Sequence, residues 1–118
     1  MNKLLIFAKS PIKGKVKTRL KKDTPLTDDN ILKLYTAFLK DTIFSASLSN
    51  VKKIYIAYYP EYSEKLMHKT IFKSTIRNLK SKIEMFPQSG NDFDARLTNA
   101  LKNIHNDIRD NIVIVGRD

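Results

Sequence analysis

The chain has 118 residues, 42% of them hydrophobic, no cysteine and a formal net charge of +10. This length allows one domain with a modest core, and no apolar run approaches the roughly 18 residues that a membrane helix needs. The N-terminal apolar run is too short for a signal peptide. Without cysteine there is neither a disulfide nor a thiolate metal site, which fits a cytoplasmic protein.

The positive charge is concentrated in the N-terminal half of the chain. Residues 1–60 carry 12 Lys and Arg against 4 Asp and Glu, whereas residues 61–118 carry 10 against 8. Such a field attracts nucleic acid, an anionic membrane surface or a small polyphosphate ligand. Charge alone does not rank these three partners.

The first predicted element is a buried strand over residues 3–8, because a continuous apolar run leads directly into a loop. The loop contains Pro11 and Gly14, has no acid up to residue 20, and carries the cations Lys9, Lys13, Lys15, Lys17 and Arg19. Backbone N–H groups and side-chain cations of such a loop can converge on a phosphate. A short helix over 16–22 would add further N–H groups. The alternative is a solvated, lysine-rich surface loop.

Residues 27–48 form the clearest predicted helix. Thr27 is its expected N-cap, and Asp28 and Asp29 complement the helix dipole in the first turn. Apolar and small side chains then recur at helical spacing and predict a core-facing stripe. The stripe consists of Ile31, Leu34, Tyr35, Phe38, Leu39, Thr42, Ile43 and Ala46.

The rest of the chain continues the alternation of strands and helices. Strands are expected over 51–59, 83–86 and 111–115. A helix over 61–75 has an apolar side made of Tyr62, Leu66, Met67 and Thr70. The last helix is expected to be capped by Asn91, and its stripe consists of Phe93, Leu97, Ala100, Leu101, Ile104 and Ile108.

The order β-α-β-α-β-α-β, with apolar rather than alternating strands, predicts a mainly parallel sheet with helices on both faces. Ligands of such sheets bind at the carboxyl ends of the strands, near the topological switch point. The basic loop, the turn over 88–92 and Asp118 should gather at that edge. Cations facing carboxylates there would suit a polyphosphate held together with a divalent metal.

With these features in view, the sequence resembles the GT-A-fold transferases known as selenodomain-associated, which are nucleotide-diphospho-sugar transferase-like. Their opening motif F-A-K-x-P-x-x-G-x-V-K-T-R-L is matched at every fixed position by residues 7–20. A Tyr-x-Ala-Phe-Leu-x-Asp-Thr segment is matched by residues 35–42. A Gln-x-x-Gly-Asp-Leu-Gly-x-Arg-Met segment is matched approximately, and a final Gly-Ser-Asp motif is matched by Gly116 and Asp118.

The sequence departs from the family in two positions and in its extent. Asp94 stands where the family usually has Gly, and Arg117 replaces a small residue beside Asp118. The resemblance covers nearly the whole chain but only the N-terminal, nucleotide-binding part of the family's domain. We therefore expect residues 1–118 to be a single, partial GT-A-like domain of three-layer α/β/α, Rossmann-like architecture, truncated relative to the family.

The resemblance implies roles for seven residues. The donor phosphates would contact Lys9, Gly14, Lys17 and Arg19. The base or ribose would contact Gln88 and Gly90, and Asp118 would bind Mg²⁺ or Mn²⁺. Asp92 stays open between a ligand contact and a helix-start role. Arg96 stays open between a helix-surface pair and a salt bridge at the edge of the core.

The resulting hypothesis is a metal-dependent transferase with a nucleotide-activated donor, first of all a nucleotide-diphospho-sugar. Nucleotidyl transfer from a nucleoside triphosphate, as in guanylyltransferases of the same fold, is the alternative, because both reactions place a base, phosphates and a metal in one cleft. A nucleic-acid-binding module is less favoured, since the cations match a small-ligand motif and no nucleic-acid motif is present. A catalytically silent chain that keeps nucleotide affinity is a further alternative. The sequence does not indicate an oligomeric state.

Overall fold

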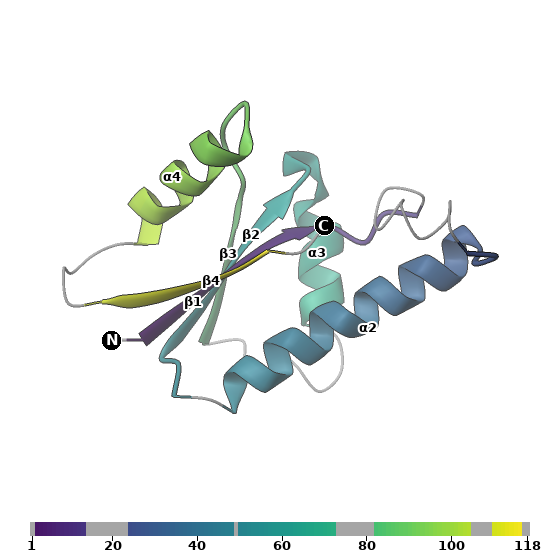
Figure 1. Cartoon of the computed structure of the whole chain (residues 1–118), viewed down its shortest axis with the longest axis horizontal. Helices are drawn as coiled ribbons and strands as arrows, with labels where there is room; N and C mark the ends of the chain where they lie inside the picture. The colour runs from purple at the N-terminus through teal and green to yellow at the C-terminus, as the bar shows by residue number, and fades with distance from the viewer. Residues whose placement is uncertain (1, 14–23, 49, 73–81, 105–109, 117–118) are drawn as a thin grey trace.

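The computed structural model describes residues 2–13, 24–48, 50–72, 82–104 and 110–116. Its elements follow one another as strands and helices in alternation (Figure 1). They are β1 (Asn2–Lys9), α2 (Asp28–Ser47), β2 (Lys53–Tyr59), the 3₁₀ turn η1 (Glu61–Ser63), α3 (Glu64–Ile71), β3 (Ile83–Pro87), α4 (Phe93–Ile104) and β4 (Asn111–Gly116). The predicted order of elements is confirmed, while the predicted helix over 16–22 lies outside the described residues.

The four strands form one parallel sheet in the order β3-β2-β1-β4. The central strand β1 pairs with β2 on one side and with β4 on the other, so that Leu5 faces Tyr55 and Ile114 in register. Strands β1 to β3 follow one direction across the sheet, and β4 returns to the opposite side of β1. The strand order therefore reverses between β1 and β4, which makes their carboxyl ends the topological switch point.

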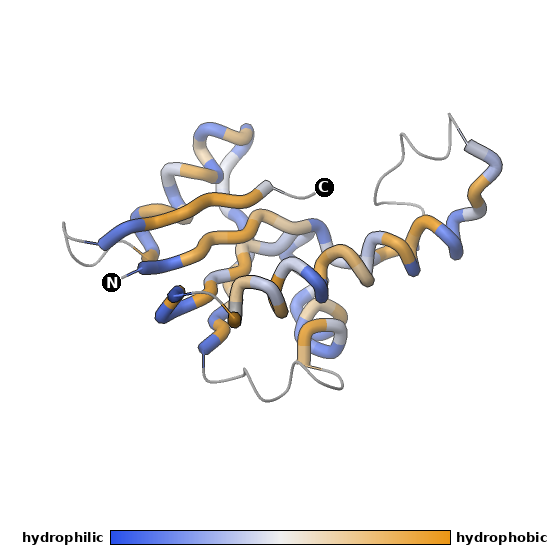
Figure 2. The backbone as a smooth tube through the Cα atoms, turned by 60° about the horizontal axis from the view of Figure 1, so that its bottom comes forward, coloured by the Kyte–Doolittle hydropathy of each residue, from blue (hydrophilic) through white to orange (hydrophobic). Residues whose placement is uncertain are grey.

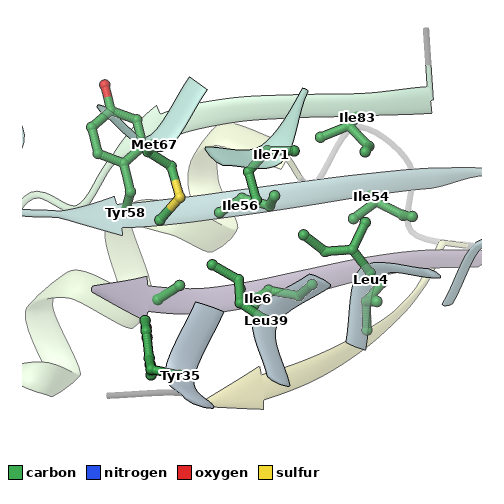
Figure 3. Packing of buried hydrophobic residues seen from close by; sticks show 12 residues of the cluster. Leu4, Ile6, Tyr35, Leu39, Ile54, Ile56, Tyr58, Met67, Ile71 and Ile83 are labelled. Carbon is green, nitrogen blue, oxygen red and sulfur yellow. The ribbon is translucent and has the colours of Figure 1, made fainter. Parts of the chain in front are cut away.

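Helices cover both faces of the sheet, as predicted (Figure 1). Helices α2 and α3 pack on one face, where their side chains interlock with alternate residues of the strands (Figure 3). The buried cluster on this face includes Leu4, Ile6, Ala8, Tyr35, Leu39, Ile43, Ile54, Ile56, Tyr58, Met67 and Ile71. Helix α4 packs on the other face over a cluster of Leu5, Phe7, Tyr55, Ala57, Ala100 and Ile104. The architecture is a three-layer α/β/α sandwich.

Helix α2 begins as the sequence predicts. The Thr27 hydroxyl accepts a hydrogen bond from the N–H of Asn30 at 3.1 Å and so caps the helix. The predicted stripe is correct for the row that is buried, Ile31, Tyr35, Leu39 and Ile43.

The stripe is wrong for Leu34 and Phe38, which are 38% and 48% exposed. Each lies one residue, about 100° around the helix, before Tyr35 or Leu39. The i, i+4 row meets the sheet, and the side chains of Leu34 and Phe38 project beyond this contact.

Helix α3 buries Met67 and Ile71 against the sheet. Tyr62 was expected on the same apolar side but is 84% exposed, because residues 61–63 form a 3₁₀ turn that rotates it away from the α-helical row. Within the described residues, no helix combines the length and the apolarity that crossing a membrane requires.

A buried ion pair joins β1 to the chain before β4 at the amino-terminal edge of the sheet. The Lys3 ammonium lies 2.7 Å from Asp110 Oδ2, and the two side chains are 3% and 6% exposed. The same ammonium donates to the carbonyl of Ile104, the last residue of α4, at 2.7 Å. One cation therefore serves both a buried carboxylate and the end of a helix, where the last carbonyls lack intrahelical donors.

Strand β4 lies at an edge of the sheet and is apolar from Ile112 to Val115 (Figure 2). Val113 and Ile114 point to opposite faces, as successive strand residues do, yet both are exposed, at 59% and 43%. Strands with apolar residues on both faces are typical of the interior of parallel sheets. Among the described residues, no strand pairs with the outer side of β4.

Candidate functional site

The carboxyl ends of the strands meet at one edge, as expected for a parallel sheet. In register, Lys9 of β1 lies opposite Tyr59 of β2, and Phe7 of β1 lies opposite Gly116 of β4. The chain leaving β3 continues the same edge, since the N–H of Gln88 donates to the Tyr58 carbonyl at 2.8 Å. The carboxyl ends of all four strands thus lie along this edge.

The exit of β1 is held by hydrogen bonds from the neighbouring strand β2, from the turn η1 and from helix α2. The N–H of Ser10 donates to the Tyr59 carbonyl at 2.8 Å. The Ser10 hydroxyl, 2.6 Å from the hydroxyl of Ser63, is fully buried. On the helix side, the Tyr35 hydroxyl bonds the backbone of Lys9. The position at which the basic loop leaves the sheet is therefore well defined.

A cleft of about 320 Å³ opens between this edge and the start of α4. Its lining combines aromatic side chains, two cations and one amide. The lining residues are Phe7, Lys9, Tyr59, Gln88, Phe93, Arg96 and Gly116. None of these described residues is acidic, so the cleft carries net positive charge and suits an anionic ligand with an apolar or aromatic part.

Arg96 of α4 is the most firmly placed cation of the cleft. Its guanidinium carbon lies 4.6 Å from the centroid of the Tyr59 ring, a cation–π distance. Its Nε donates to the Gly90 carbonyl at 3.2 Å. Among the described residues it has no carboxylate partner, so neither role foreseen for Arg96, a helix-surface pair or a core-edge salt bridge, is found there. None of the described residues bonds the terminal nitrogens of the fork, which can therefore face a ligand.

A second cleft, of about 420 Å³, lies on the far side of Tyr59 and Arg96. It is bordered by Glu61 and by the turn from Pro87 to Asn91. Gln88 borders both clefts, and its side-chain N–H donates to the Ala57 carbonyl at 2.8 Å. Because this bond uses the amide nitrogen, the amide oxygen is the group that Gln88 can offer to a ligand as an acceptor.

The turn over 88–92 is attached to α4 at several points. Asn99 donates to the Ser89 carbonyl at 2.8 Å, and Asp92 Oδ1 accepts from the N–H of Ala95 at 2.8 Å. Asp92 is therefore the N-cap of α4, and the prediction of Asn91 in that place is wrong. The chain turns into the helix one residue later than expected, because it is the Asp92 carboxylate that reaches the N–H three residues on.

Gly90 allows the turn to approach the helix closely. Its φ is +137°, and an added Cβ would lie 2.8 Å from both Ala95 Cβ and Arg96 N. Both the backbone conformation and the space demand glycine.

Replacing Gly90 with alanine should therefore lower the free energy of unfolding by about 1–3 kcal/mol, measured by urea denaturation. Gly116→Ala is the matched control, because a Cβ there meets no atom of the described residues within 4 Å. We expect a change within about 0.5 kcal/mol. Equal losses in the two variants would contradict the close approach described for Gly90.

The structure brings together three of the seven predicted site residues. Lys9 and Gln88 line the first cleft, and Gln88 and Gly90 border the second. Four predicted residues lie outside the described part of the chain: Gly14, Lys17, Arg19 and Asp118.

The predicted metal centre cannot be assembled from the described residues. Among them, no three histidine, aspartate or glutamate side chains form a group that could hold a metal ion. Asp92 caps a helix, and the predicted ligand Asp118 lies outside the described residues. The metal site with Asp118 therefore stays a prediction.

Sequence reasoning did not single out Tyr59, Phe7 or Phe93 as residues of the site. Phe7 and Phe93 have their ring centroids 5.7 Å apart, and together they form the apolar part of the cleft. The sequence could have indicated Phe93. It is the first residue of a helix that follows a parallel strand, and such positions lie at the ligand-binding edge.

A parallel sheet with a cationic cleft at its switch point is the arrangement of nucleotide-binding α/β proteins. The fold is similar to the crystal structure of a "putative nucleotide-diphospho-sugar transferase" from Desulfovibrio desulfuricans G20, with a TM-score of 0.72 and 25% sequence identity. This likeness covers 99% of the present chain and 47% of that chain. No protein-family model matches the sequence, and no curated protein matches it significantly.

The comparison supports the predicted class at its coarse level, an α/β fold of the nucleotide-diphospho-sugar transferase type. The chain spans about half the length of that structure. The narrower resemblance to the selenodomain-associated transferases stays a prediction.

Proposed function

We propose that this chain is the donor-binding part of a metal-dependent transferase that uses a nucleotide-activated donor, first of all a nucleotide-diphospho-sugar. The observation that carries the proposal is the cleft at the switch point, where Lys9 and Arg96 line one cavity with no acid among the described lining residues. A diphosphate needs such a site, because its charges must be matched by cations once water is displaced.

In this proposal the two cations approach the diphosphate from different elements. Lys9 comes from the end of β1 and acts as a compact charge, whereas the Arg96 guanidinium can engage two phosphate oxygens at once. During transfer, both would stabilise the negative charge that develops on the leaving diphosphate. Mg²⁺ or Mn²⁺, held with the help of Asp118, would supply further neutralisation of the phosphates when bound.

The base and ribose are proposed to lie toward Gln88 and Gly90. The Gln88 amide oxygen can accept a hydrogen bond from the base or a ribose hydroxyl, and Tyr59 offers an aromatic edge beside it. Gly14, Lys17 and Arg19 are proposed to complete the phosphate site from the basic loop, as the sequence motif predicts.

The proposal is tested by thermal denaturation with UDP-, GDP- and CDP-linked sugars in the presence of Mn²⁺ or Mg²⁺. Ligand at ten times its Kd stabilises a protein by about 1.4 kcal/mol, which raises the Tm of a domain of this size by several degrees. We expect such a shift for at least one nucleotide, a smaller shift with EDTA, and none for Lys17→Ala combined with Arg19→Ala.

The products then distinguish the two transfer reactions. Release of a nucleoside diphosphate from the sugar donor supports glycosyl transfer, whereas release of pyrophosphate from a nucleoside triphosphate supports nucleotidyl transfer. No response to any nucleotide, together with salt-sensitive binding to random DNA, would overturn the proposal in favour of a nucleic-acid-binding module.

A further inference from the structure

The hydroxyl of Tyr35 forms two hydrogen bonds with one residue at the end of β1. It donates to the Lys9 carbonyl at 2.7 Å and accepts from the Lys9 N–H at 3.0 Å. Tyr35 itself is 1% exposed and comes from α2, the helix on the face opposite to α4. Figure 3 shows Tyr35 beside the carboxyl end of β1.

These two hydrogen bonds take the place that strand pairing has elsewhere in β1. Backbone groups of successive strand residues point to alternate sides, and the N–H of Ser10 points toward β2, where it bonds Tyr59. The N–H and carbonyl of Lys9 therefore face the side of β4, but the last described pair on that side is Phe7 with Gly116. Backbone groups that are partly shielded from water also need partners, and one phenol supplies both a donor and an acceptor here.

The hydrogen bonds from Tyr35 and the first cleft lie on opposite sides of Lys9. Ala8 packs in the cluster under α2, whereas Phe7 and Lys9 line the cleft under α4, as the alternation of strand residues requires. Tyr35 thus fixes the backbone of Lys9 from one face, and the Lys9 side chain extends from the other. The basic loop also begins at this point.

We infer that Tyr35 is a positioning residue of the donor site, which sets the place of Lys9 in the first cleft and so its contact with the phosphates of the ligand. This inference rests on the proposed function. It gives the Tyr35 hydroxyl an effect on phosphate binding although the hydroxyl lines neither cleft. The apolar ring of Tyr35 packs in the core, and only its hydroxyl oxygen positions Lys9.

The test compares Tyr35→Phe with Tyr58→Phe. Both variants remove one hydroxyl from the same buried cluster, but the Tyr58 hydroxyl points away from β1 (Figure 3). Burial, and then the charges of Glu64 and Glu61, raise the pKa of Tyr58 above 10.0, so the control loses a neutral hydroxyl. Affinities are measured by calorimetry for a nucleoside, its diphosphate and inorganic pyrophosphate.

Tyr35→Phe should weaken the binding of the diphosphate and of pyrophosphate by roughly five- to tenfold and leave the nucleoside unchanged. Tyr58→Phe should alter none of the three. An equal loss for nucleoside and diphosphate, an unchanged diphosphate affinity, or the same loss in Tyr58→Phe would each overturn the inference.

Amide hydrogen exchange separates this inference from the proposed function. Without the phenol oxygen, the Lys9 amide should exchange at least tenfold faster, while the Ile6 amide in the middle of β1 keeps its protection. If the unmodified protein binds no nucleotide or pyrophosphate, the proposed function fails, and the donor-site role of Tyr35 fails with it. If the Lys9 amide exchanges in Tyr35→Phe as fast as in the unmodified protein, the Tyr35 hydroxyl does not hold the Lys9 backbone, even where nucleotide binding is found.

Discussion

Replacement of Arg96 by glutamine should lower the affinity for a nucleoside diphosphate by roughly 10- to 100-fold. A hydrogen bond to a charged group contributes about 1.5–3 kcal/mol, and 1.4 kcal/mol corresponds to a factor of ten. The loss should be large because the guanidinium lines both clefts and has no carboxylate partner among the described residues. Calorimetric titration with the diphosphate measures it directly.

Two further variants show which property of Arg96 matters. Arg96→Lys keeps the charge but loses the planar fork, so an intermediate affinity is expected. Lys102→Gln is the matched control for charge, because Lys102 is an exposed cation in the last turn of the same helix. If Lys102→Gln costs as much affinity as Arg96→Gln, the protein acts through its general positive field and the cleft is not the phosphate site.

Replacement of Lys3 by methionine should lower the free energy of unfolding by about 3–5 kcal/mol, the usual cost of removing one partner from a buried ion pair. The change removes the Lys3 ammonium from the buried Asp110 carboxylate and the donor to the Ile104 carbonyl. Small domains are stable by only about 5–15 kcal/mol, so this loss would be a large part of the total stability. Urea denaturation followed by circular dichroism measures the difference.

The control is Lys53→Met, which removes a cation from a pair with Glu84 that is 3.9 Å long and partly exposed. Such a pair contributes at most about 1 kcal/mol. The double variant Lys3→Met with Asp110→Leu should recover much of the loss, because an apolar pair can replace a buried ion pair. A loss in Lys3→Met no larger than that in Lys53→Met would show that the buried pair is not what joins β1 to the chain before β4.

The elements of the fold could be predicted from the sequence because their signals are local. Apolar runs ended by Pro60 and Pro87, a threonine cap and a helical stripe each lie within a few residues. The wrong predictions concern which side chains of an element are buried against its neighbours. Leu34 and Phe38 fit the stripe of α2, but the width of the contact with the sheet decides their exposure, and that width depends on distant strands.

The candidate site could be predicted only where its residues belong to a contiguous motif. Lys9 and Gln88 follow apolar strands and were expected at the edge of the sheet. The pairing of Arg96 with Tyr59 was not, because it joins a helix to a strand that precedes it by a whole β-α unit. The ion pair of Lys3 with Asp110 could not be predicted for the same reason, since nothing near either residue in the sequence indicates the other.

Among the described residues no strand covers the outer side of β4, and this has a consequence for the behaviour of the chain in concentrated solution. An uncovered strand edge offers a row of backbone donors and acceptors to any other extended segment. Natural proteins usually guard such edges with lysine, proline or a bulge, whereas residues 112–115 are Ile, Val, Ile and Val. This strand is therefore the part of the described chain most prone to intermolecular β-pairing. A single Val113→Lys substitution should oppose such pairing.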